Sequence, residues 1–367
     1  MGLVAEIMGK QSMKRISQKN IAKKAGVSPS AVCLLLKDPN TKRVSPETRA
    51  LIYEVMRENG YAFKSDVKSG DILCVYRPPP GALMSNRDVS FFYGSLLMAV
   101  EQTGQRLGHT VRLRSYNHVS ELPALMRDPA VAGIISINSS RLAEEEDCGK
   151  PVIAVNAVYS SSCDTVQSSH RGSARDQIDL LCRYGHQRIA FFSVIYPPEQ
   201  SESDREHHES VTERFSGYCE GLFQNNLPIR QEYCCVEMLP DFLSDVKDPV
   251  QRALAALFSL PEPPTAILAF NDRFAITLIR AAQAAGLRVP EDLSIVGNDN
   301  TEEGRHCLPA LTTAEQNRVA LGQVAVERLV QRIDNKDQGP FQMISIPLKV
   351  IERNSVSAPP TVIKRLK

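Results

Sequence analysis

Apolar residues recur with two different spacings along this chain. Close to the N-terminus, apolar side chains at 51, 52, 55 and 56 follow Thr48 at intervals of three and four residues. That period predicts an amphipathic helix with one buried face. From Asp71 onward, short apolar runs alternate with stretches of helical spacing, the first being a strand over 72–76 and a helix over 89–107. Because alternating strands and helices form parallel sheets flanked by helices, the larger part of the chain is predicted to be α/β.

The same two spacings predict the remaining elements of the α/β part. Further strands are predicted from short apolar runs at 111–116, 133–138, 152–155, 189–194, 233–237, 266–270 and 293–297. Further helices are predicted from helical spacing at 121–127, 173–184, 213–224, 249–259 and 273–286. These strands are too numerous for one simple sheet, so two successive lobes are expected. Residues 197–211 are charged and rich in proline and serine, and we expect them to form an exposed loop of the second lobe.

The segment from Ile16 to Tyr61 has the turn chemistry of a small helical module. Gly26 supplies the positive φ that a sharp turn between two helices requires, and Ser28 is placed to cap the second helix. Pro29 suits the first position of that helix, where no amide donor is missed. Ser45 is placed in the same way before a third helix. Two short helices around a glycine turn indicate a helix-turn-helix, which lays its second helix in the major groove of DNA.

Charge separates this module from the rest of the chain. Residues 10–64 contain twelve Lys and Arg against four Asp and Glu, a net charge of +8. The whole chain carries only +1, so the remainder carries −7. A basic module joined to an acidic body is typical of a nucleic-acid binder, because Lys and Arg displace the counterions of phosphates. The alternative is a solvated helical bundle rich in lysine, which would leave the turn chemistry unexplained.

Length and composition indicate a globular protein of two or three domains. The chain has 367 residues, and 43% of them are apolar, which is enough to fill real cores. No apolar run approaches the ~18 residues that span a bilayer, and residues 1–12 lack the features of a secretion signal. We interpret them as a tail that translation from Met13 would omit. The nine cysteines form no CxxC pair, which indicates reduced thiols in a cytoplasm.

Several motifs resemble, in order and spacing, those of the lactose repressor / galactose repressor family of bacterial transcription regulators. AGVSPSAV resembles the family's helix-turn-helix, and VSPETR with NGY resembles its third helix. FFYGSLLMAVEQTGQRLGH resembles the start of the effector domain, whereas YGHQRIAF and RFSGY resemble the entry into its second lobe. The pattern continues with PPTAILAFNDRFAITLIRAAQAAGLRVPEDLSIVGNDN, LPALTTAEQ, LGQVAVERLV and ERNSVSAPP. The resemblance covers residues 16–360.

The resemblance implies a domain order. After the tail, a helix-turn-helix domain is expected at 13–61 and a linker at 62–70, followed by an effector domain at 71–360. The effector domain should resemble periplasmic sugar-binding proteins, with two lobes of parallel sheets flanked by helices. The expected lobes are 71–187 with a return segment at 314–340, and 188–313 with 341–357.

The resemblance also implies partners. The family forms homodimers, and the segment 317–333 resembles its dimer-forming segment. Because a two-fold dimer reads two half-sites, a near-palindromic double-stranded DNA operator is expected. Closure of the lobes on a small carbohydrate-like effector is expected to control operator binding, as in a repressor.

A ligand pocket is expected between the lobes, where the carboxyl ends of parallel strands meet. Aromatic faces, a guanidinium fork, a carboxylate and amides together suit a polyhydroxy ligand. A structural role stays open for each residue, with Arg214 paired to a surface carboxylate, Asn271 as a helix cap and the phenylalanines in the core. The positions that match the family's pocket are Phe91, Phe92, Asn156, Arg214, Asn271, Asp299 and Gln316.

The DNA-reading helix departs from the family. The family often has Thr at Ala31, Ser at Cys33 and Arg at Leu34. The predicted exposed face is Ser30, Leu34 and Lys37, and Leu34 would either touch a thymine methyl or pack inside the module. Contacts to phosphates are therefore expected to carry much of the affinity. The positions expected to contact DNA are Ser17, Lys19, Lys23, Ser28, Pro29, Ser30, Ala31, Leu34, Lys37 and Lys42.

Two further departures limit what the resemblance implies. The family usually has a hinge helix after Gly-Tyr, whose leucine wedges into the minor groove and bends the DNA. Residues 62–70 read AFKSDVKSG, with no leucine and with Val67 as a poor substitute. We therefore expect weaker bending, or a different coupling between ligand and DNA. In the first lobe, Ser169-His170 replaces the family's Asp-Asn pair, which removes an expected pocket contact.

Other classes of function fit less well. An enzyme on a doubly wound sheet would need a catalytic motif, and the chain has no Walker loop, no GxGxxG after a strand and no GxSxG. A solute-binding protein would need a secretion signal and would leave the basic module unexplained. A regulator controlled by a partner protein, or without an effector, stays open because the pocket is altered. We expect no cofactor, no membrane association and no metal, since the adjacent His207 and His208 would point apart in a solvated loop.

Overall fold

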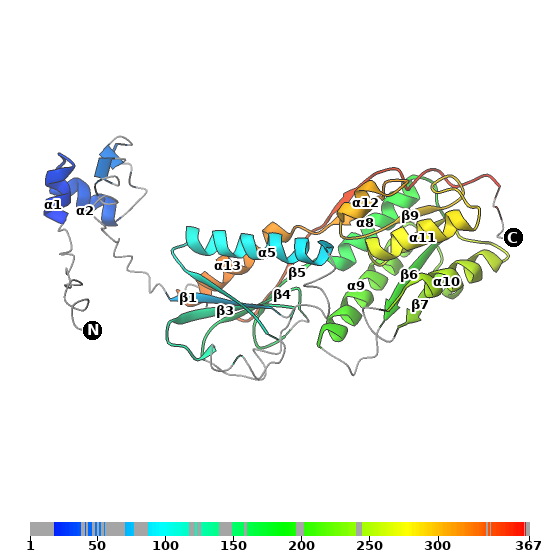
Figure 1. Ribbon diagram of the computed structural model, residues 1–367, viewed down its shortest axis with the longest axis horizontal. Helices are drawn as coiled ribbons and strands as arrows, with labels where there is room; N and C mark the ends of the chain where they lie inside the picture. Colours follow the sequence, from blue (N-terminus) through cyan, green and yellow to red (C-terminus); the bar gives the residue numbers. More distant parts are fainter. Residues whose placement is uncertain are drawn as a thin grey trace, which may run out of the picture. The chain divides into compact units, whose positions relative to one another are not determined.

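The computed structural model forms two compact units, Met1–Asp66 and Val67–Lys367 (Figure 1). The boundary between them falls within the predicted linker. No helix among the described residues is long and apolar enough to cross a membrane. The residues that the structure describes are 18–37, 41, 43–45, 48–49, 51–52, 55, 70–76, 87–116, 122, 126–138, 149–157, 160–195, 202–239, 244–334, 337, 339–362 and 364.

The N-terminal unit is built on two helices around a glycine turn, α1 (Gln18–Lys24) and α2 (Pro29–Lys37). Gly26 has a φ of 62°, the left-handed conformation that the turn requires. The Ser28 hydroxyl accepts a hydrogen bond from the Ala31 amide at 3.1 Å, which caps α2. The predicted helix-turn-helix is therefore confirmed. Its core consists of aliphatic side chains, Ile21, Ala22, Ala25, Val32, Leu35, Val44, Ile52 and Val55.

The first lobe of the larger unit contains a parallel sheet of six described strands in the order β11-β5-β4-β3-β1-β2. Helices α5 (Arg87–Arg106) and α13 (Arg318–Ile333) pack together on one face of it (Figure 1). Gly322 permits this close packing, because a Cβ there would lie 2.9 Å from the main-chain oxygen of Leu96. The strands are β1 (Asp71–Tyr76), β2 (Val111–Ser115), β3 (Val131–Ile137), β4 (Val152–Val155), β5 (Asp164–Ser168) and β11 (Met343–Ile346).

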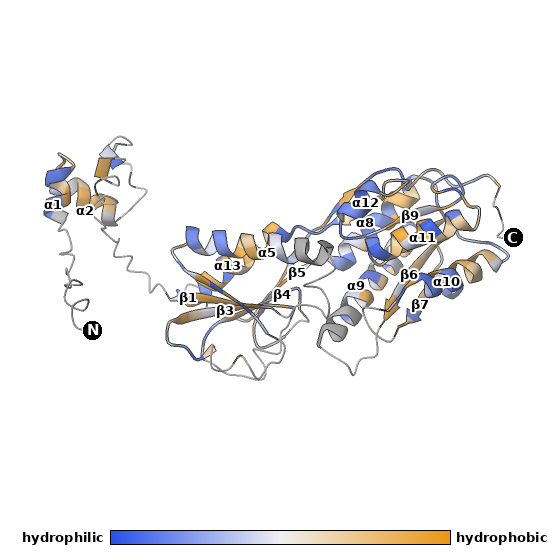
Figure 2. Ribbon diagram, viewed as in Figure 1, coloured by the Kyte–Doolittle hydropathy of each residue, from blue (hydrophilic) through white to orange (hydrophobic). Residues whose placement is uncertain are grey.

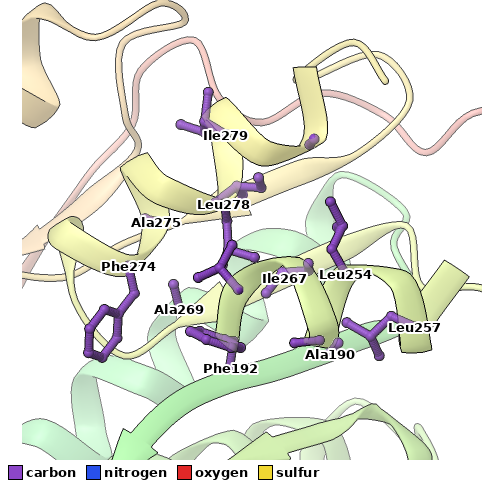
Figure 3. Close-up of a cluster of buried hydrophobic side chains, with 14 of the residues drawn as sticks. Ala190, Phe192, Leu254, Leu257, Ile267, Ala269, Phe274, Ala275, Leu278 and Ile279 are labelled. Carbon is purple, nitrogen blue, oxygen red and sulfur yellow. The ribbon is translucent and has the colours of Figure 1, made fainter. Parts of the chain in front are cut away.

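The second lobe contains a parallel sheet of four described strands in the order β7-β6-β8-β9. Its core under two helices includes Phe192 edge-on to Phe274, with ring centroids 5.9 Å apart (Figure 3). The strands are β6 (Ile189–Ile195), β7 (Cys234–Met238, after the 3-10 turn Gln231–Tyr233), β8 (Ala266–Ala269) and β9 (Ser294–Val296). The helices are α8 (His170–Arg183) and α9 (Glu202–Gln224) on one face, and α10 (Lys247–Ser259) and α11 (Asp272–Ala284) on the other.

Hydropathy separates the layers of both lobes. The strands are largely hydrophobic, whereas the flanking helices are hydrophilic on the faces turned away from the sheets (Figure 2). Side chains of β6 alternate between the two cores of the second lobe: Phe191 packs under α8 and α9, and Phe192 packs under α10 and α11. This alternation is the period that a strand covered on both faces requires.

Within the part of the chain that the structure describes, three passages connect the lobes. The first runs from β5 to α8, and the second runs from β10 (Thr313–Glu315) to α13. The third runs from β11 to β12 (Lys349–Ile351), which pairs antiparallel with β10 beside the second sheet. A short helix, α12 (Glu302–His306), precedes β10. These passages form the hinge of the two-lobed unit.

The passages correct two predicted lobe boundaries. The expected end of the first lobe at 187 is wrong, because α8 packs with α9 against the second sheet. The expected assignment of 341–357 to the second lobe is wrong at its start, because β11 pairs with β5, Ile344 lying opposite Val166. The sequences of β5 and β11, DTVQS and MISI, are short and partly polar. A hydrophobic pattern therefore gives neither strand a clear signal.

The predicted exposed loop at 197–211 is wrong from residue 202 onward, because α9 begins at Glu202. This segment has no apolar periodicity, so the hydrophobic pattern contains no helical signal there. Val211, which is buried, begins the apolar face of the helix. The predicted helix at 121–127 lies mostly outside the described residues.

Candidate functional site

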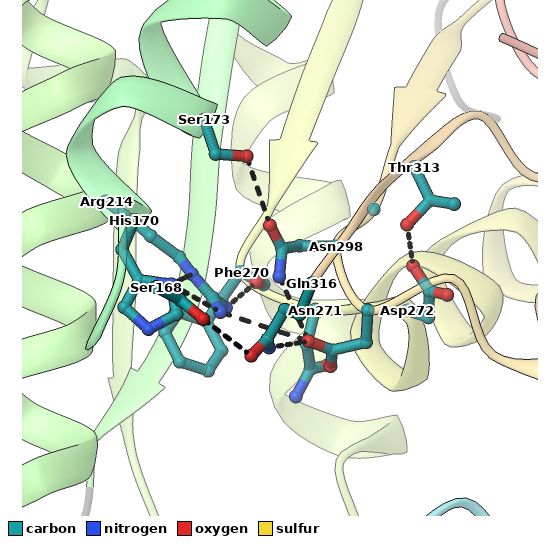
Figure 4. A network of polar contacts seen from close by, with 12 residues as sticks. Ser168, His170, Ser173, Arg214, Phe270, Asn271, Asp272, Asn298, Thr313 and Gln316 are labelled. Carbon is teal, nitrogen blue, oxygen red and sulfur yellow. Dashed lines mark hydrogen bonds and ion pairs between the residues drawn. The ribbon is translucent and has the colours of Figure 1, made fainter. Parts of the chain in front are cut away.

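A connected group of polar side chains lies at the junction of the two lobes, with Arg214 of α9 at its centre (Figure 4). The Arg214 side chain is buried, and its Nη1 donates to the main-chain oxygen of Phe270. Its guanidinium carbon lies 4.1 Å from the centroid of the Phe270 ring. Nε and Nη2 lie 3.4 and 3.2 Å from Nδ1 of His170. The guanidinium therefore already has a stacking partner and two hydrogen-bond acceptors within the protein.

Asp299 follows β9 and connects this arginine to the hinge. Its φ of 126° is rare for a residue with a side chain, and such backbone conformations cluster at functional sites. Asp299 Oδ1 accepts from Gln316 Nε2 at 2.8 Å and from Asn298 Nδ2 at 3.0 Å, and lies 3.9 Å from Arg214 Nη2. Gln316 Oε1 in turn accepts from the Ser168 hydroxyl at 3.1 Å. One chain of contacts thus joins the first passage, the second passage and the end of β9.

Asn271 begins α11 as its N-cap, and its Oδ1 accepts from the main-chain amide three residues later at 3.0 Å. The capping role that the sequence left open is therefore real. Asp272 beside it is fully buried and accepts from the Thr301 amide at 2.7 Å and from the Thr313 hydroxyl. Burial and, to a lesser extent, the charge of Asp299 together raise the pKa of Asp272 to about 6. Through the hydrogen bond from the Thr301 amide, Asp272 holds the loop that follows Asp299.

His170 begins α8 and stands where the family's Asp-Asn pair was expected. Burial lowers the pKa of His170 well below its usual value, and the charge of Arg214 lowers it further. The ring is therefore neutral and accepts from the guanidinium through Nδ1. Burial also lowers the pKa of Arg214 to about 10, so this side chain remains charged at neutral pH. Beside the pair lies a cavity of about 40 Å³ that residues of both lobes line, among them Asn156, Ser168 and Glu213.

On the first lobe, Asn156 follows β4 with a φ of 48°, and its Oδ1 accepts from the Ser168 amide at 3.0 Å. It therefore braces the end of the neighbouring strand and reaches the junction through Ser168. Phe91 and Phe92 lie on α5, but their side chains lie outside the described residues. Of the expected pocket residues, Arg214, Asp299 and Gln316 are directly connected, and Figure 4 places Asn271 beside them.

Sequence reasoning missed several polar residues at the same edges of the sheets. Ser168 and Asn298 take part in the Gln316–Asp299 contacts. Asn138, at the end of β3 with a φ of 60°, donates to the Tyr93 hydroxyl at 2.6 Å. Ser168 ends β5, Asn138 directly follows β3, and Asn298 is the second residue after β9. A position close to the end of a strand is therefore a usable signal, but the sequence of β5 has no clear strand pattern and does not mark Ser168.

The DNA-reading helix α2 differs from the predicted exposed face at one described position, Leu34. Ser30 and Cys33 are exposed, whereas Leu34 and Ala31 are half-buried and pack against the core of the unit. Of the two roles that the sequence leaves open for Leu34, the structure favours packing inside the module; a contact of Leu34 with DNA stays a prediction. Ser28, which caps α2, and Pro29, Lys19 and Lys23 are exposed. Ser17, Lys42 and the side chain of Lys37 lie outside the described residues.

Two family models match successive parts of the chain. The model of bacterial regulatory proteins of the lacI family matches residues 17–62. The model of the periplasmic binding protein-like domain matches residues 178–356. The first match covers the helix-turn-helix, and the second covers most of the second lobe together with the second and third passages and α13.

Curated relatives align over almost the whole chain. The HTH-type transcriptional repressor PurR of Photorhabdus laumondii is 26% identical over 357 residues, which are 94% of this chain and 98% of the relative. The HTH-type transcriptional repressor CytR of Escherichia coli K12 is 26% identical over 356 residues, 94% of this chain and 97% of the relative.

Solved structures share the fold. The transcriptional regulator CelR in complex with cellobiose has a TM-score of 0.61 at 22% identity, covering 93% of this chain and all of that chain. The lac repressor dimer bound to operator has a TM-score of 0.57 at 23% identity, covering 94% of this chain and all of that chain. A LacI family regulator from Enterococcus faecium with bound ribose has a TM-score of 0.57 at 25% identity, with coverage of 78% and 99%.

A helix-turn-helix joined to a hinged, two-lobed binding domain defines a DNA-binding transcription regulator that responds to a small molecule. The chain combines a lacI-family helix-turn-helix domain with a periplasmic-binding-protein-like domain, as do the lactose repressor / galactose repressor regulators that it resembles. Members of this family bind operator DNA and small-molecule effectors and are not enzymes. The enzyme interpretation is therefore set aside.

Proposed function

We propose that this regulator is a repressor whose affinity for its operator is controlled by a small sugar-like ligand between the lobes. The observation that carries the proposal is the group formed by Arg214, Asp299 and Gln316, which joins α9, the end of β9 and the second passage. A ligand that contacts these three residues bears directly on the hinge. Because a ligand shifts an equilibrium only through different contacts in the two states, this location favours control of lobe closure.

The chemistry of the group supports a polyhydroxy ligand. Asp299 is an acceptor at the junction, with a side chain that is 27% exposed. Arg214 and the amide of Asn271 add donors. Sugars carry many hydroxyl groups, so a set of donors and acceptors fits them. The relatives of known structure in complex with cellobiose and ribose support the same class.

One observation favours a second candidate, in which a partner protein or no effector controls DNA binding. The donors of Arg214 already face His170 and the main-chain oxygen of Phe270. A ligand must compete with these contacts, whereas a regulator without an effector would keep them. A ligand screen separates the two candidates.

We propose a homodimer that reads a near-palindromic operator in the cytoplasm. Large apolar side chains are exposed on or next to the helices around the hinge: Met98 of α5 is 61% exposed and Leu308 after α12 is 82% exposed. Exposed apolar side chains of this size favour burial against a second copy. The contacts to DNA would come from Lys19, Lys23 and the exposed face of α2.

DNA binding is tested by fluorescence anisotropy with labelled duplexes from the region upstream of the coding sequence. We expect tighter binding to one such duplex than to a shuffled sequence, with affinity that falls as salt rises. Lys23→Gln should weaken binding to both and reduce the salt slope by about 0.9, the contribution of one phosphate contact. Equal affinity for all duplexes would refute a sequence-specific regulator.

Ligand control is tested by a thermal-shift screen of sugars and sugar acids. A ligand that binds the folded state raises the melting temperature. We expect at least one compound to do so with wild-type protein, and Asp299→Asn to remove the shift. Asp176→Asn, on the exposed surface of α8, is the matched control and should keep it. A screen without any stabilising compound would favour the second candidate.

A further inference from the structure

A second and larger cavity, of about 460 Å³, lies at the hinge. Helices α5 and α13 of the first lobe line it through Ser95 and Arg318, and α12 and β12 of the second lobe line it through Arg305 and Lys349. The second and third passages complete its wall. It shares no lining residue with the small cavity beside His170. Only Gln316 of the expected pocket residues contributes to it, so the family's ligand positions do not account for this cavity.

Positive charge predominates in the lining of this hinge cavity. Arg305, Arg318 and Lys349 are cationic, and Glu315 is the one carboxylate among the described lining residues. Glu315 Oε1 accepts from Asn300 Nδ2 at 3.0 Å, which occupies part of its acceptor capacity. The side chains of Asn317 and Ser95 add neutral polar groups. The cavity therefore offers two more positive than negative groups together with hydrogen-bonding partners.

The two cations from the second lobe have the freedom to contact a ligand. The Arg305 side chain is 43% exposed; its Nε donates a long hydrogen bond to Asn300 Oδ1 at 3.4 Å, and its Nη1 lies 3.7 Å from the carboxylate of Glu302. Such exposed pairs contribute little, so this contact does not hold the guanidinium strongly. Lys349 is exposed on β12, directly opposite Glu315 in the β10–β12 pairing. Arg318 is buried and donates to the main-chain oxygen of Asp299 at 2.8 Å, which fixes its position at the cavity wall.

We propose that the hinge cavity binds a small anion that carries phosphate or carboxylate groups. Guanidinium and ammonium groups form charge-assisted hydrogen bonds with such oxyanions. A volume of about 460 Å³ lies within the usual range for small-molecule sites. Arg305 and Lys349 contact the anion, and Arg318 supplies positive charge at the wall.

This site is coupled to the junction of the lobes, a consequence that rests on the proposed ligand control. Its lining comes from both lobes, so its shape depends on their relative orientation. It also contains Gln316, whose side chain holds Asp299, and Arg318, which holds the main chain of the same residue. An anion in the hinge cavity therefore favours one lobe orientation and changes the affinity of the cleft for its ligand, and the coupling is reciprocal.

Isothermal titration calorimetry on the full-length chain tests the proposal, with inorganic pyrophosphate and citrate as separate probes. Binding of pyrophosphate alone assigns a phosphate site, and binding of citrate alone assigns a carboxylate site. We expect the double variant Arg305→Gln/Lys349→Gln to weaken binding of the active probe about tenfold or more, since it removes two charge-assisted contacts. Lys247→Gln/Arg252→Gln, two exposed cations on α10, is the matched control and should bind as wild type does.

The basic helix-turn-helix also attracts anions, but it is unchanged in both double variants. A difference in binding between the two variants therefore reports the hinge cavity. Binding that is equal in the wild type and the cavity variant would overturn the proposal, as would the absence of heat from both probes at millimolar concentration. The melting temperature of each variant, measured without probe, verifies that it is folded. Operator anisotropy on the same proteins keeps the two proposals apart, because wild type without specific DNA binding refutes the proposed function and leaves the anion result standing.

Discussion

Gln316 donates from Nε2 to Oδ1 of Asp299 at 2.8 Å and accepts from the Ser168 hydroxyl through Oε1 at 3.1 Å. One side chain, buried in the second passage, thus connects the first passage to the carboxylate at the end of β9. The amide is suited to this place because it donates to an acceptor on one side and accepts from a donor on the other.

Two substitutions of Gln316 distinguish its roles: leucine removes both hydrogen bonds, and glutamate removes only the donor. Gln316→Leu should lower the free energy of unfolding by about 1–3 kcal/mol, since it leaves the buried Ser168 hydroxyl without this acceptor. Gln316→Glu should cost more, because it sets a carboxylate against the carboxylate of Asp299. Urea denaturation at neutral pH measures both. A glutamate variant as stable as the leucine variant would contradict the donor role of the amide.

Arg214 is expected to act through the shape of its guanidinium as well as its charge. Arg214→Lys keeps the charge but loses the fork that faces His170 and the stacking on Phe270. We expect the affinity for a cleft ligand to fall about tenfold or more. Arg171→Lys, an exposed arginine of α8, should leave it unchanged. Calorimetry with any ligand found in the thermal-shift screen measures the affinities, and equal losses in both variants would count against a specific role for Arg214.

His186 is predicted to make the protein less stable in mild acid. The ring is buried, with Nδ1 2.8 Å from the Thr265 hydroxyl and Nε2 2.9 Å from the main-chain oxygen of Ser357. Burial lowers the pKa of His186 to about 4, whereas an unfolded histidine titrates near 6.5. Between these values the unfolded chain binds the proton more tightly. The stabilisation is therefore complete above pH ~6.5 and falls by up to about 3 kcal/mol as pH drops towards 4.

Urea denaturation at several pH values between 7 and 4 tests this histidine. His186→Gln should be less stable at neutral pH, because it loses buried hydrogen bonds, and its stability should change less with pH than that of wild type. His306→Gln, at an exposed position on α12, should keep the wild-type dependence. An unchanged pH dependence in His186→Gln would show that other groups cause the loss in acid.

Gly217 is predicted to be essential for the packing of α8 on α9. A Cβ at this position would lie 2.1 Å from the main-chain oxygen of Arg171. Gly217→Ala should therefore cost about 1–3 kcal/mol of stability, since backbone has to move. Gly94→Ala, in α5, has no described neighbour within 4 Å of the new Cβ and should instead stabilise by about 0.5–1 kcal/mol. Thermal denaturation of the two variants, with opposite expected signs, gives a clear test.

Cys33 is predicted to lie against DNA, because it is exposed on α2 one turn after Ser30. Carboxymethylation with iodoacetate adds bulk and negative charge and should abolish operator binding. Cys33→Ser should bind the operator and resist the treatment, which controls for the other cysteines. Equal inhibition of both proteins in an anisotropy assay would place the sensitive thiol elsewhere.

Local sequence was sufficient for much of the fold. The helix-turn-helix depends on neighbours within a few residues, Gly26 for the turn and Ser28 for the cap, so its signal lies in one window. The apolar strands and helices of the larger unit also have a local period, and they occur close to where they are predicted. Strand-end positions point to Asn156, Asn271 and Asp299 for the same reason, whereas Arg214, which lies on a helix, is indicated only by the family resemblance.

Tertiary structure alone decided which distant segments meet. The strand β11 joins the first sheet because it pairs with β5, more than a hundred residues earlier in the chain. The helix α8 joins the second lobe because its buried face packs against α9 and β6. Packing of separate segments also produces the hydrogen bond of Gln316 to Ser168, the burial of Leu34 against the core of its module and the basic cavity at the hinge. The sequence by itself determined a DNA-binding module and a two-lobed α/β body, since these follow from local periods and turns. Long-range packing decided which residues meet at the hinge, since contacts between distant segments produce no periodic pattern in the sequence.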